Sequence, residues 1–476
     1  MTPHMTVDKI NVSLAIDNAK KLLKDEKEIP SSVKISLELM ITIISLLVDR
    51  LNLNSSNSSI PPSKNPIGKQ IRKTRKDKGV KRKPGAQKGH QGTTLKKIEN
   101  PDSIETIKID KRTIPAGNYT DVGFDSRQVF DIEISLTVIE YRAQILQDDK
   151  GKQFVAKFPE AVSKAAQYGS GVKAHSVYMS QSQLIPQARV VESFESQMNL
   201  PISKGSISNF NKEAYLRLET FENWAKAKLI DSELVHADET GINLNGKNGW
   251  LHSASNSKVV LFHADEKRGK EAIERMGIIP NFSGFLVHDH WKPYYSYDSI
   301  HCLCHAHHLR ELERAWDHDQ QKWAKNLRKL LEQINTSTKD AGGVLPLANI
   351  QKYIKQYQKI LKSGENECPL GPKEKGKRGR QKQSKSRNLL TRLRDYEDDV
   401  LRFMKIGTVP FTNNMAENDI RMTKVQQKVS GCFRSMNGAK YFCRIRSFLL
   451  TCKKNNISRA HALRDLFEGK LPSFMD

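Results

Sequence analysis

The sequence predicts a multidomain α+β protein in which an α/β core is interrupted by a helical insertion. Its 476 residues exceed what one hydrophobic core usually organises, so we expect two to four domains. Apolar runs of strand length concentrate between residues 231 and 300, whereas residues 317–409 have a helical pattern and are strongly charged. The net charge of +25 and the pI of about 9.6 favour a polyanionic partner, because Lys and Arg release condensed counterions when they neutralise phosphates. Nucleic acid fits this charge better than an anionic membrane surface does.

Residues 1–53 are predicted to form an N-terminal helix of coiled-coil type. Apolar residues follow 4-3-4-3 spacing at Leu37, Ile41, Ile44, Val48 and Leu51. The seam covers only about two heptads, so the helix could pack on its own protein or on a second copy. We predict self-association, and therefore a homo-oligomer.

Residues 54–100 are predicted to be a linker followed by a basic arm. Ser, Asn and Pro dominate up to Pro62, which is typical of linkers. From Lys64 to Lys97 thirteen Lys or Arg residues stand against one acid, Asp77. The central cations of this block are Lys81, Arg82 and Lys83. Repeated Gly and Pro argue against a helix, so we expect an extended arm on DNA phosphates, with a solvated tail as the alternative.

Two smaller units are expected before the core. Residues 101–160 alternate apolar and polar side chains and are predicted to form a small β-rich unit. Residues 161–230 turn helical, and the segments 187–197 and 206–218 flank a turn that contains Gly205. This pair could be a helix-turn-helix that reads DNA or an ordinary helical pair.

The predicted core begins at residues 231–316 and resumes at residues 410–455, ahead of a C-terminal tail at residues 456–476. Three strand-like runs, a short helix and a fourth strand-like run follow one another between Leu234 and His288. This is the order of a ribonuclease-H-like α/β core. The charged helical block at residues 317–409 is then an insertion within that core.

Three acidic residues stand in suggestive places. Asp238 and Asp289 each end an apolar strand-like run, and Glu417 opens a helix-like stretch. Carboxylates suit hard cations, and two Mg²⁺ or Mn²⁺ ions about 3.5–4 Å apart can activate an attacking oxygen and stabilise a leaving one. Spacing leaves other roles open: a turn for Asp238, a cap for Asp289, and for Glu417 a capping box with Asn414 as N-cap.

A basic stripe and a histidine cluster accompany these acids. Arg421, Lys424 and Lys428 lie four, seven and eleven residues beyond Glu417, so all four share one helix face, either on DNA or solvated. His305 and His308 either position substrate or pack in the interior. The spacing of the neighbouring cysteines does not fit a zinc ribbon.

The cellular location expected is the bacterial cytoplasm, with nucleoid association. The six cysteines show no disulfide-scaffold density, the N-terminus lacks a secretory pattern, and the apolar run from Leu39 to Val48 is shorter than the ~20 residues of a membrane span.

The chain resembles the insertion-sequence-sixty-six family of DDE transposases over nearly its full length. Six segments carry the resemblance: Asn54–Ser63, Lys83–His90, His236–Thr240, Cys304–Leu312, Asn413–Glu417 and Lys428–Ser435. The resemblance implies a ribonuclease-H-like core, catalysis by Asp238, Asp289 and Glu417 with a divalent metal, and a contact of Lys424 with DNA at the transposon end. Arg434, in the last segment, joins the expected DNA-binding cations.

The chain departs from the family in two places. Members usually carry a Cys-based zinc segment after the basic block, but no cysteine precedes Cys302, so no zinc is expected. His290 follows Asp289 where the family tends to have a small residue.

We therefore expect a DNA transposase that cuts and joins double-stranded DNA, at transposon ends and at the target, with accessory proteins of the same element as further partners. The alternatives are a catalytically inactive, transposase-derived DNA-binding protein and a metal-dependent nuclease that never joins strands.

Overall fold

The computed structural model describes residues 6–7, 10–25, 29–51, 53, 57–58, 95–371 and 383–475. The predicted basic arm, with Lys81, Arg82 and Lys83, lies outside the described residues. Within them the chain is an α+β protein, as the sequence predicts, and its largest sheet has five strands.

The five-stranded sheet has the order β7-β6-β5-β8-β9. Its strands are β5 (Leu234–Leu244), β6 (Lys247–Ser255), β7 (Val260–Asp265), β8 (Phe285–His288) and β9 (Ile300–Leu303). Neighbours pair antiparallel from β5 to β7, whereas β5 pairs parallel with β8 and β8 with β9. Asn245 and Gly246 alone join β5 to β6 with φ of 49° and 85°, a conformation that favours Asn-Gly in two-residue hairpins.

Helices cover both edges of this sheet. Hydroxyls of α14 (Met436–Lys454) accept hydrogen bonds from the edge strand β7: Ser447 from the N–H of Phe262 at 2.8 Å and Thr451 from that of Val260 at 3.1 Å. At the other edge, Arg402 donates from Nε to the carbonyl of His301 in β9 at 3.0 Å. Unpaired strand edges can associate with other chains, and these contacts cover part of both edges of the sheet.

One hydrophobic core joins the sheet to helices that precede its strands in the sequence, lie between them or follow them. These helices are α3 (Ser170–Val177), α4 (Gln187–Met198), α5 (Lys204–Arg217), α6 (Glu219–Ile230), α7 (Lys270–Met276), α14 and α15 (Arg459–Phe467). The predicted helix pair is present as α4 and α5: Asn199 ends α4 in the left-handed region, and the Ser203 hydroxyl caps α5 by accepting from the N–H of Ser206. Ile207 and Phe210 of α5 are buried, so this face of the pair belongs to the core.

A second core forms where the predicted insertion meets β8 and β9. The insertion comprises α9 (Lys322–Asp340), α10 (Leu347–Glu367), α11 (Lys385–Asp395) and α12 (Glu397–Leu401), and it follows α8 (His305–Asp317). Trp323 and Tyr357 are fully buried and share this core with Val287 of β8 and Leu303 of β9. The insertion is therefore a helical unit packed on one edge of the sheet.

The N-terminal helices α1 (Val12–Asp25) and α2 (Ser31–Leu51) pack against each other. Side chains of the predicted seam, such as Leu37, Ile44 and Leu51, are exposed, as are Leu46 and Leu47. In the described part of the chain, Ser31–Val48 is the one stretch long and apolar enough to cross a membrane, although Ser, Thr and Glu interrupt its apolar run. The same composition suits a helix that packs against a second copy.

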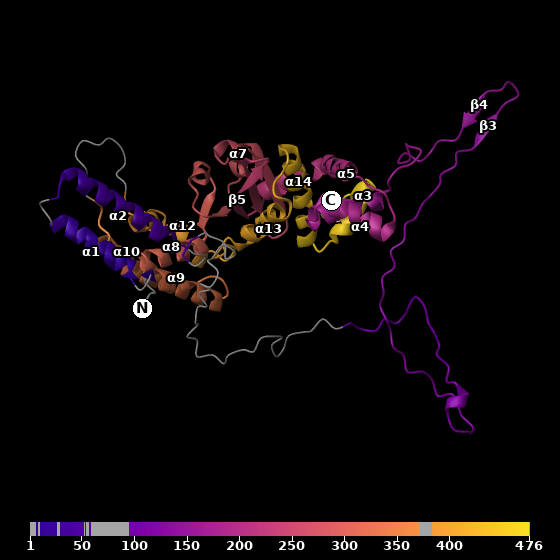
Figure 1. Cartoon of the computed structure of the whole chain (residues 1–476), viewed down its shortest axis with the longest axis horizontal. Coiled ribbons are helices and arrows are strands. Elements are labelled where there is room, and N and C mark those ends of the chain that lie inside the picture. Colours follow the sequence, from indigo (N-terminus) through magenta and orange to yellow (C-terminus); the bar gives the residue numbers. More distant parts are fainter. Residues whose placement is uncertain are drawn as a thin grey trace.

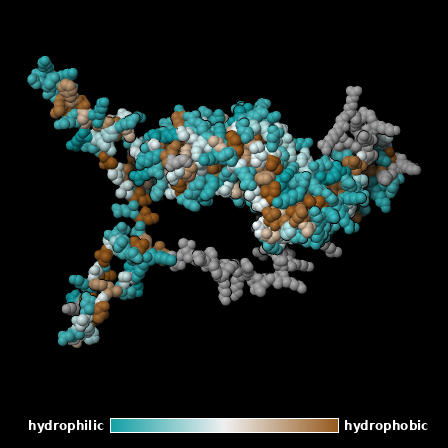
Figure 2. All heavy atoms as spheres, turned by 180° about the vertical axis from the view of Figure 1, so that it is seen from behind, coloured by the Kyte–Doolittle hydropathy of each residue, from teal (hydrophilic) through white to brown (hydrophobic). Residues whose placement is uncertain are grey.

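The segment predicted as a small β-rich unit differs in the structure. Between residues 101 and 160 the strands are β3 (Ile145–Gln147) and β4 (Gln153–Val155), and the rest is extended or turn apart from a short 3-10 helix at Lys111–Thr113. Alternating side chains such as Ile107 and Val129 are each 92% exposed. The segment extends from the rest of the protein as two arms, and Figure 2 shows apolar residues along both of them. Alternation alone does not make a stable strand, because an isolated hairpin needs another sheet or helix on which to bury its apolar face.

The elements are arranged along one long axis (Figure 1). The sheet lies in the middle, α8 to α12 lie at one end with α1 and α2, and α3 to α5 lie on the other side of the sheet, with the β3–β4 hairpin extending beyond them. The α13 helix (Asn414–Ser430) crosses near the sheet and packs on β5.

Candidate active site

The parallel pairing of β5 with β8 brings Asp238 and Asp289 to neighbouring positions. His236 pairs with Val287, so Asp238 in β5 and Asp289, directly after β8, each lie two residues beyond this pair. The Asp238 carboxylate accepts a hydrogen bond from the N–H of Glu239 at 2.9 Å, and that of Asp289 from the N–H of Trp291 at 3.1 Å. Carboxyl ends of parallel strands are where α/β sheets usually place their sites.

The position of Asp238 differs in one respect from the prediction. We expected it to end a strand, but β5 continues to Leu244, because its second half pairs with β6 across the Asn245–Gly246 hairpin. What ends just before Asp238 is the pairing with β8.

Asn413 fixes the start of α13 on β5. Its side chain donates from Nδ2 to the carbonyl of Ala237 at 2.8 Å, and its Oδ1 lies 2.7 Å from Nδ1 of His236. Its backbone N–H donates to Sγ of Cys304 at 3.2 Å. The residue is buried, so these bonds set where the first turn of α13, and with it Glu417, stands against the strand that carries Asp238.

Glu417 does not form the capping box that its spacing allowed. The N-cap is Asn413 rather than Asn414, and it makes no side-chain capping bond. Instead, Oε1 of Glu417 lies 3.8 Å from Sγ of Cys304 and 3.8 Å from Nδ1 of His307, and Oε2 lies 4.0 Å from Nη2 of Arg310.

The acids influence one another electrostatically. Burial raises the pKa of Asp238 well above its usual range, and the charges of Glu239, Asp289 and Glu417 raise it further. Like charges that share a small space disfavour ionisation, whereas a bound divalent cation would reverse that preference. The carboxylates therefore form an electronegative group suited to hard cations.

An ion pair beside Asp238, between the buried Glu239 and the partly exposed Arg268, has no counterpart in our sequence predictions. Arg268 donates to Oε1 of Glu239 from Nη2 at 2.6 Å and from Nε at 3.2 Å, and the Tyr294 hydroxyl donates to Oε2 at 2.8 Å. The Arg268 guanidinium lies 4.9 Å from the ring of Trp250 and 4.6 Å from that of Trp291. Protein donors thus occupy both oxygens of Glu239, which leaves Asp238 and Asp289 available for a cation.

The structure places His307, rather than His305 or His308, beside Glu417. His305 is buried, with its Nδ1 3.0 Å from the carbonyl of Phe411 and its ring stacked on that of Phe411. His308 is also buried. The sequence held a signal for this: His305 and His308 share one face of α8 with Leu312, an apolar residue that points to the interior.

His290 has a positive φ of 73°, a region that favours glycine. Glycine, which has no Cβ, would therefore suit this position better than a residue with a side chain. Its ring packs against those of Tyr295 and Tyr396, and Nδ1 lies 3.0 Å from the Tyr295 hydroxyl.

Of the predicted cations, Arg421, Lys424 and Lys428 lie on α13, and Arg434 follows the end of this helix. Lys424 donates from Nζ to the carbonyl of Gly241, and Gln427 accepts from the N–H of Asn243 at 3.1 Å. Three further cations, Arg421, Lys428 and Arg434, are exposed.

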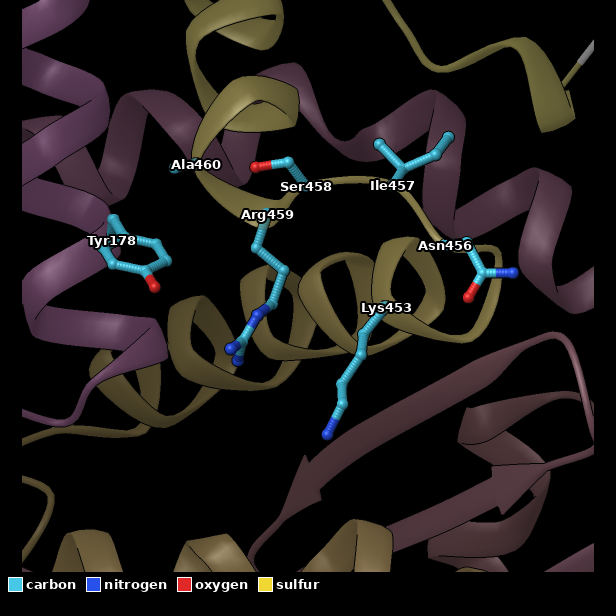
Figure 3. A pocket seen from close by; sticks show the side chains of 7 residues that line it. All are labelled: Tyr178, Lys453, Asn456, Ile457, Ser458, Arg459 and Ala460. Carbon is cyan, nitrogen blue, oxygen red and sulfur yellow. The ribbon is translucent and has the colours of Figure 1, made fainter. Parts of the chain in front are cut away.

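The structure also has a surface hollow of about 460 Å³, and none of the three acidic residues lines it. Lys453 and Arg459 contribute cationic side chains to its wall, opposite Tyr178 (Figure 3). It contains no carboxylate, so it offers no alternative site for two-metal chemistry.

Comparison with known families identifies the family of this chain. A model of a family of unknown function (DUF6444) matches residues 15–96. No curated protein matches the chain. The model described as Transposase IS66 family matches residues 165–441, which include Asp238, Asp289 and Glu417. Because this match spans more than half of the chain, the protein belongs to the IS66 family of transposases, DNA-cutting enzymes as a class.

Proposed function

We propose that this protein is an active DDE transposase, in which Asp238, Asp289 and Glu417 form the catalytic centre. The observation that carries the proposal is their approach from two adjacent parallel strands and one helix, with Asn413 linking that helix to β5. The strand order β7-β6-β5-β8-β9, antiparallel in its first half and parallel in its second, supports a ribonuclease-H-like core.

The reaction has two steps on DNA. Water attacks the phosphodiester at an element end, the bond between phosphorus and the 3′ oxygen breaks, and that oxygen takes a proton to become a free 3′-hydroxyl. The hydroxyl then attacks a target phosphodiester, forms a new bond to phosphorus and releases a target 3′-hydroxyl. Two Mg²⁺ or Mn²⁺ ions, when bound by the three carboxylates, would supply charge neutralisation on the phosphate and lower the pKa of the attacking oxygen.

The remaining residues hold the substrate and the carboxylates. Glu239, fixed by Arg268 and Tyr294, positions Asp238 through its backbone N–H, which donates to the Asp238 carboxylate. The cations Arg421, Lys424, Lys428 and Arg434 neutralise phosphates of the bound strand. Double-stranded DNA is therefore the partner, and the exposed apolar residues of α2 provide a surface for a second copy.

The test is a paired binding and nicking assay with the native element ends and Mn²⁺. Asp238→Asn and Glu417→Gln should abolish nicking and leave DNA affinity near wild type. Glu266→Gln, an exposed acid outside the centre, is the control and should nick normally. Retained nicking in both carboxylate variants would refute the proposal.

Two other outcomes favour other functions. Binding by the wild type without any metal-dependent nicking favours an inactive DNA-binding protein of transposase descent. Nicking without joining favours a nuclease.

A further inference from the structure

We propose that Cys304, His307 and Glu417 form a binding site for a borderline transition-metal ion, with Zn²⁺ the best-matched biological ion. The site shares Glu417 with the proposed catalytic centre. Its bearing on catalysis rests on the proposed function, whereas its existence does not. From the sequence we expected no zinc, because the cysteine spacing does not fit a zinc ribbon. Glu417 lies 113 residues from Cys304, and only the fold brings them together.

The ligand atoms already lie near the separation that a metal requires. Sγ of Cys304 and Nδ1 of His307 are each 3.8 Å from Oε1 of Glu417, and all three atoms lie within 4.8 Å of one another. Zinc bonds of about 2.0–2.3 Å in a tetrahedron hold neighbouring ligand atoms roughly 3.3–3.8 Å apart. Small side-chain movements would therefore close the site.

The scaffold of the site is rigid. Cys304 is the N-cap residue of α8 and His307 lies on its first turn, so one helix start carries both ligands. Glu417 lies on the first turn of α13, which Asn413 ties to β5. The N–H of Asn413 donates to Sγ of Cys304, and such donors stabilise a metal-bound thiolate.

His307 lacks a partner that a metal would provide. Its Nδ1 is buried and has no hydrogen-bond partner among the described residues, although it faces Glu417. A buried polar atom without a partner costs free energy, and a cation between the two groups would remove that cost.

The donor set selects the kind of ion. Thiolate and imidazole prefer zinc and its neighbours over Mg²⁺, which prefers oxygen. Arg310 approaches Oε2 of Glu417 at 4.0 Å, whereas Oε1 faces the thiol and the imidazole. Three protein ligands leave a fourth position open, as in zinc sites that accept water or substrate oxygen.

Titration of the full-length protein with Co²⁺, a spectroscopic substitute for Zn²⁺, tests the site without any activity measurement. The wild type should develop a thiolate-to-cobalt absorption band, and excess Zn²⁺ should remove it. Cys304→Ser should lack the band, and His307→Gln should weaken Co²⁺ binding by at least about 10-fold. Cys432→Ser, which alters a partly exposed cysteine outside the cluster, is the matched control and should keep it.

Asp238→Asn separates this proposal from the proposed function, since it should lose nicking and keep the band. If Asp238→Asn still nicks DNA, the proposed catalytic centre fails while the band continues to report the metal site. No band in the wild type, or an unchanged band in Cys304→Ser, would overturn the metal site. His307→Gln decides the matter if Cys304→Ser does not fold, because unchanged Co²⁺ affinity in that variant also overturns the site.

Discussion

The side chain of Asn413 donates a hydrogen bond of 2.8 Å to the carbonyl of Ala237, the residue that precedes Asp238. This bond joins the helix of Glu417 to the strand of the first aspartate. Two carboxylates that are far apart in sequence thereby acquire a fixed relative position.

Replacing Asn413 should therefore uncouple the two elements. Asn413→Ala leaves the carbonyl of Ala237 and the ring of His236 buried without their partner, which should cost about 1–3 kcal/mol of unfolding free energy. Nicking should fall by about 100-fold, because small displacements of catalytic groups are costly. Chemical denaturation and a nicking assay measure the two effects. Asn414→Ala, which alters the exposed neighbouring residue, is the control. Equal losses of stability and nicking in Asn414→Ala and Asn413→Ala would contradict the linking role of Asn413.

The pair of Arg268 with Glu239 should require arginine itself. Arg268→Lys keeps the charge but loses the two-nitrogen contact with Glu239 and the packing between Trp250 and Trp291. Because Arg268 is 42% exposed, we expect a modest loss of about 1–2 kcal/mol, together with slower nicking. Lys267→Ala, at an exposed surface pair, should change stability by less than about 0.5 kcal/mol. Comparable losses in both variants would count against a special role for Arg268.

The raised pKa of Asp238 predicts how stability depends on pH. Its folded-state pKa exceeds its unfolded value, so the unfolded state binds fewer protons and stability falls as pH rises from about 4 through the raised pKa. Without metal at pH 7.5, Asp238→Asn should melt above the wild type, by roughly 2–4 °C for each ~1 kcal/mol gained.

The difference in melting temperature between Asp238→Asn and the wild type should vanish near pH 4. Mn²⁺ should raise the melting temperature of the wild type more than that of Asp238→Asn. Scanning calorimetry across pH measures both. A wild type that melts higher than Asp238→Asn in the absence of metal at pH 7.5 would contradict the argument.

Cations on α13 should act through phosphates. Arg421→Ala and Lys428→Ala should each weaken DNA binding for all sequences and reduce the slope of log affinity against log salt by about one. Band-shift titrations at several salt concentrations give the slope. Lys329→Ala, an exposed lysine on the insertion helix α9, should leave it unchanged. If the α13 variants keep the wild-type slope, these residues do not lie on DNA.

The exposed seam of α2 should mediate self-association. Ile44→Glu places a charge among apolar side chains of this helix and should lower the mass measured by light scattering for the full-length protein. Ser36→Glu, also exposed on α2, is the control for added charge. A monomeric wild type would rule out the interface.

Elements with local signals could be predicted from the amino-acid sequence. Periodicity and apolar runs predicted the strands around Asp238 and Asp289, the α7 helix between them, the α4–α5 pair and the helical insertion, because residues that face one core repeat at the period of their element. It missed β9, a four-residue strand, and it overestimated strand content at residues 101–160, where alternation has no partner surface on which to pack.

Tertiary structure alone decided what each side chain touches. That Arg268 holds Glu239, that Asn413 bonds Ala237, and that Glu417 faces Cys304 and His307 are contacts between residues far apart in the chain. Sequence spacing contains no information on such distances, since they depend on how strands pair and helices pack. The sequence thus supplied three acids in plausible places, and the fold decided their surroundings.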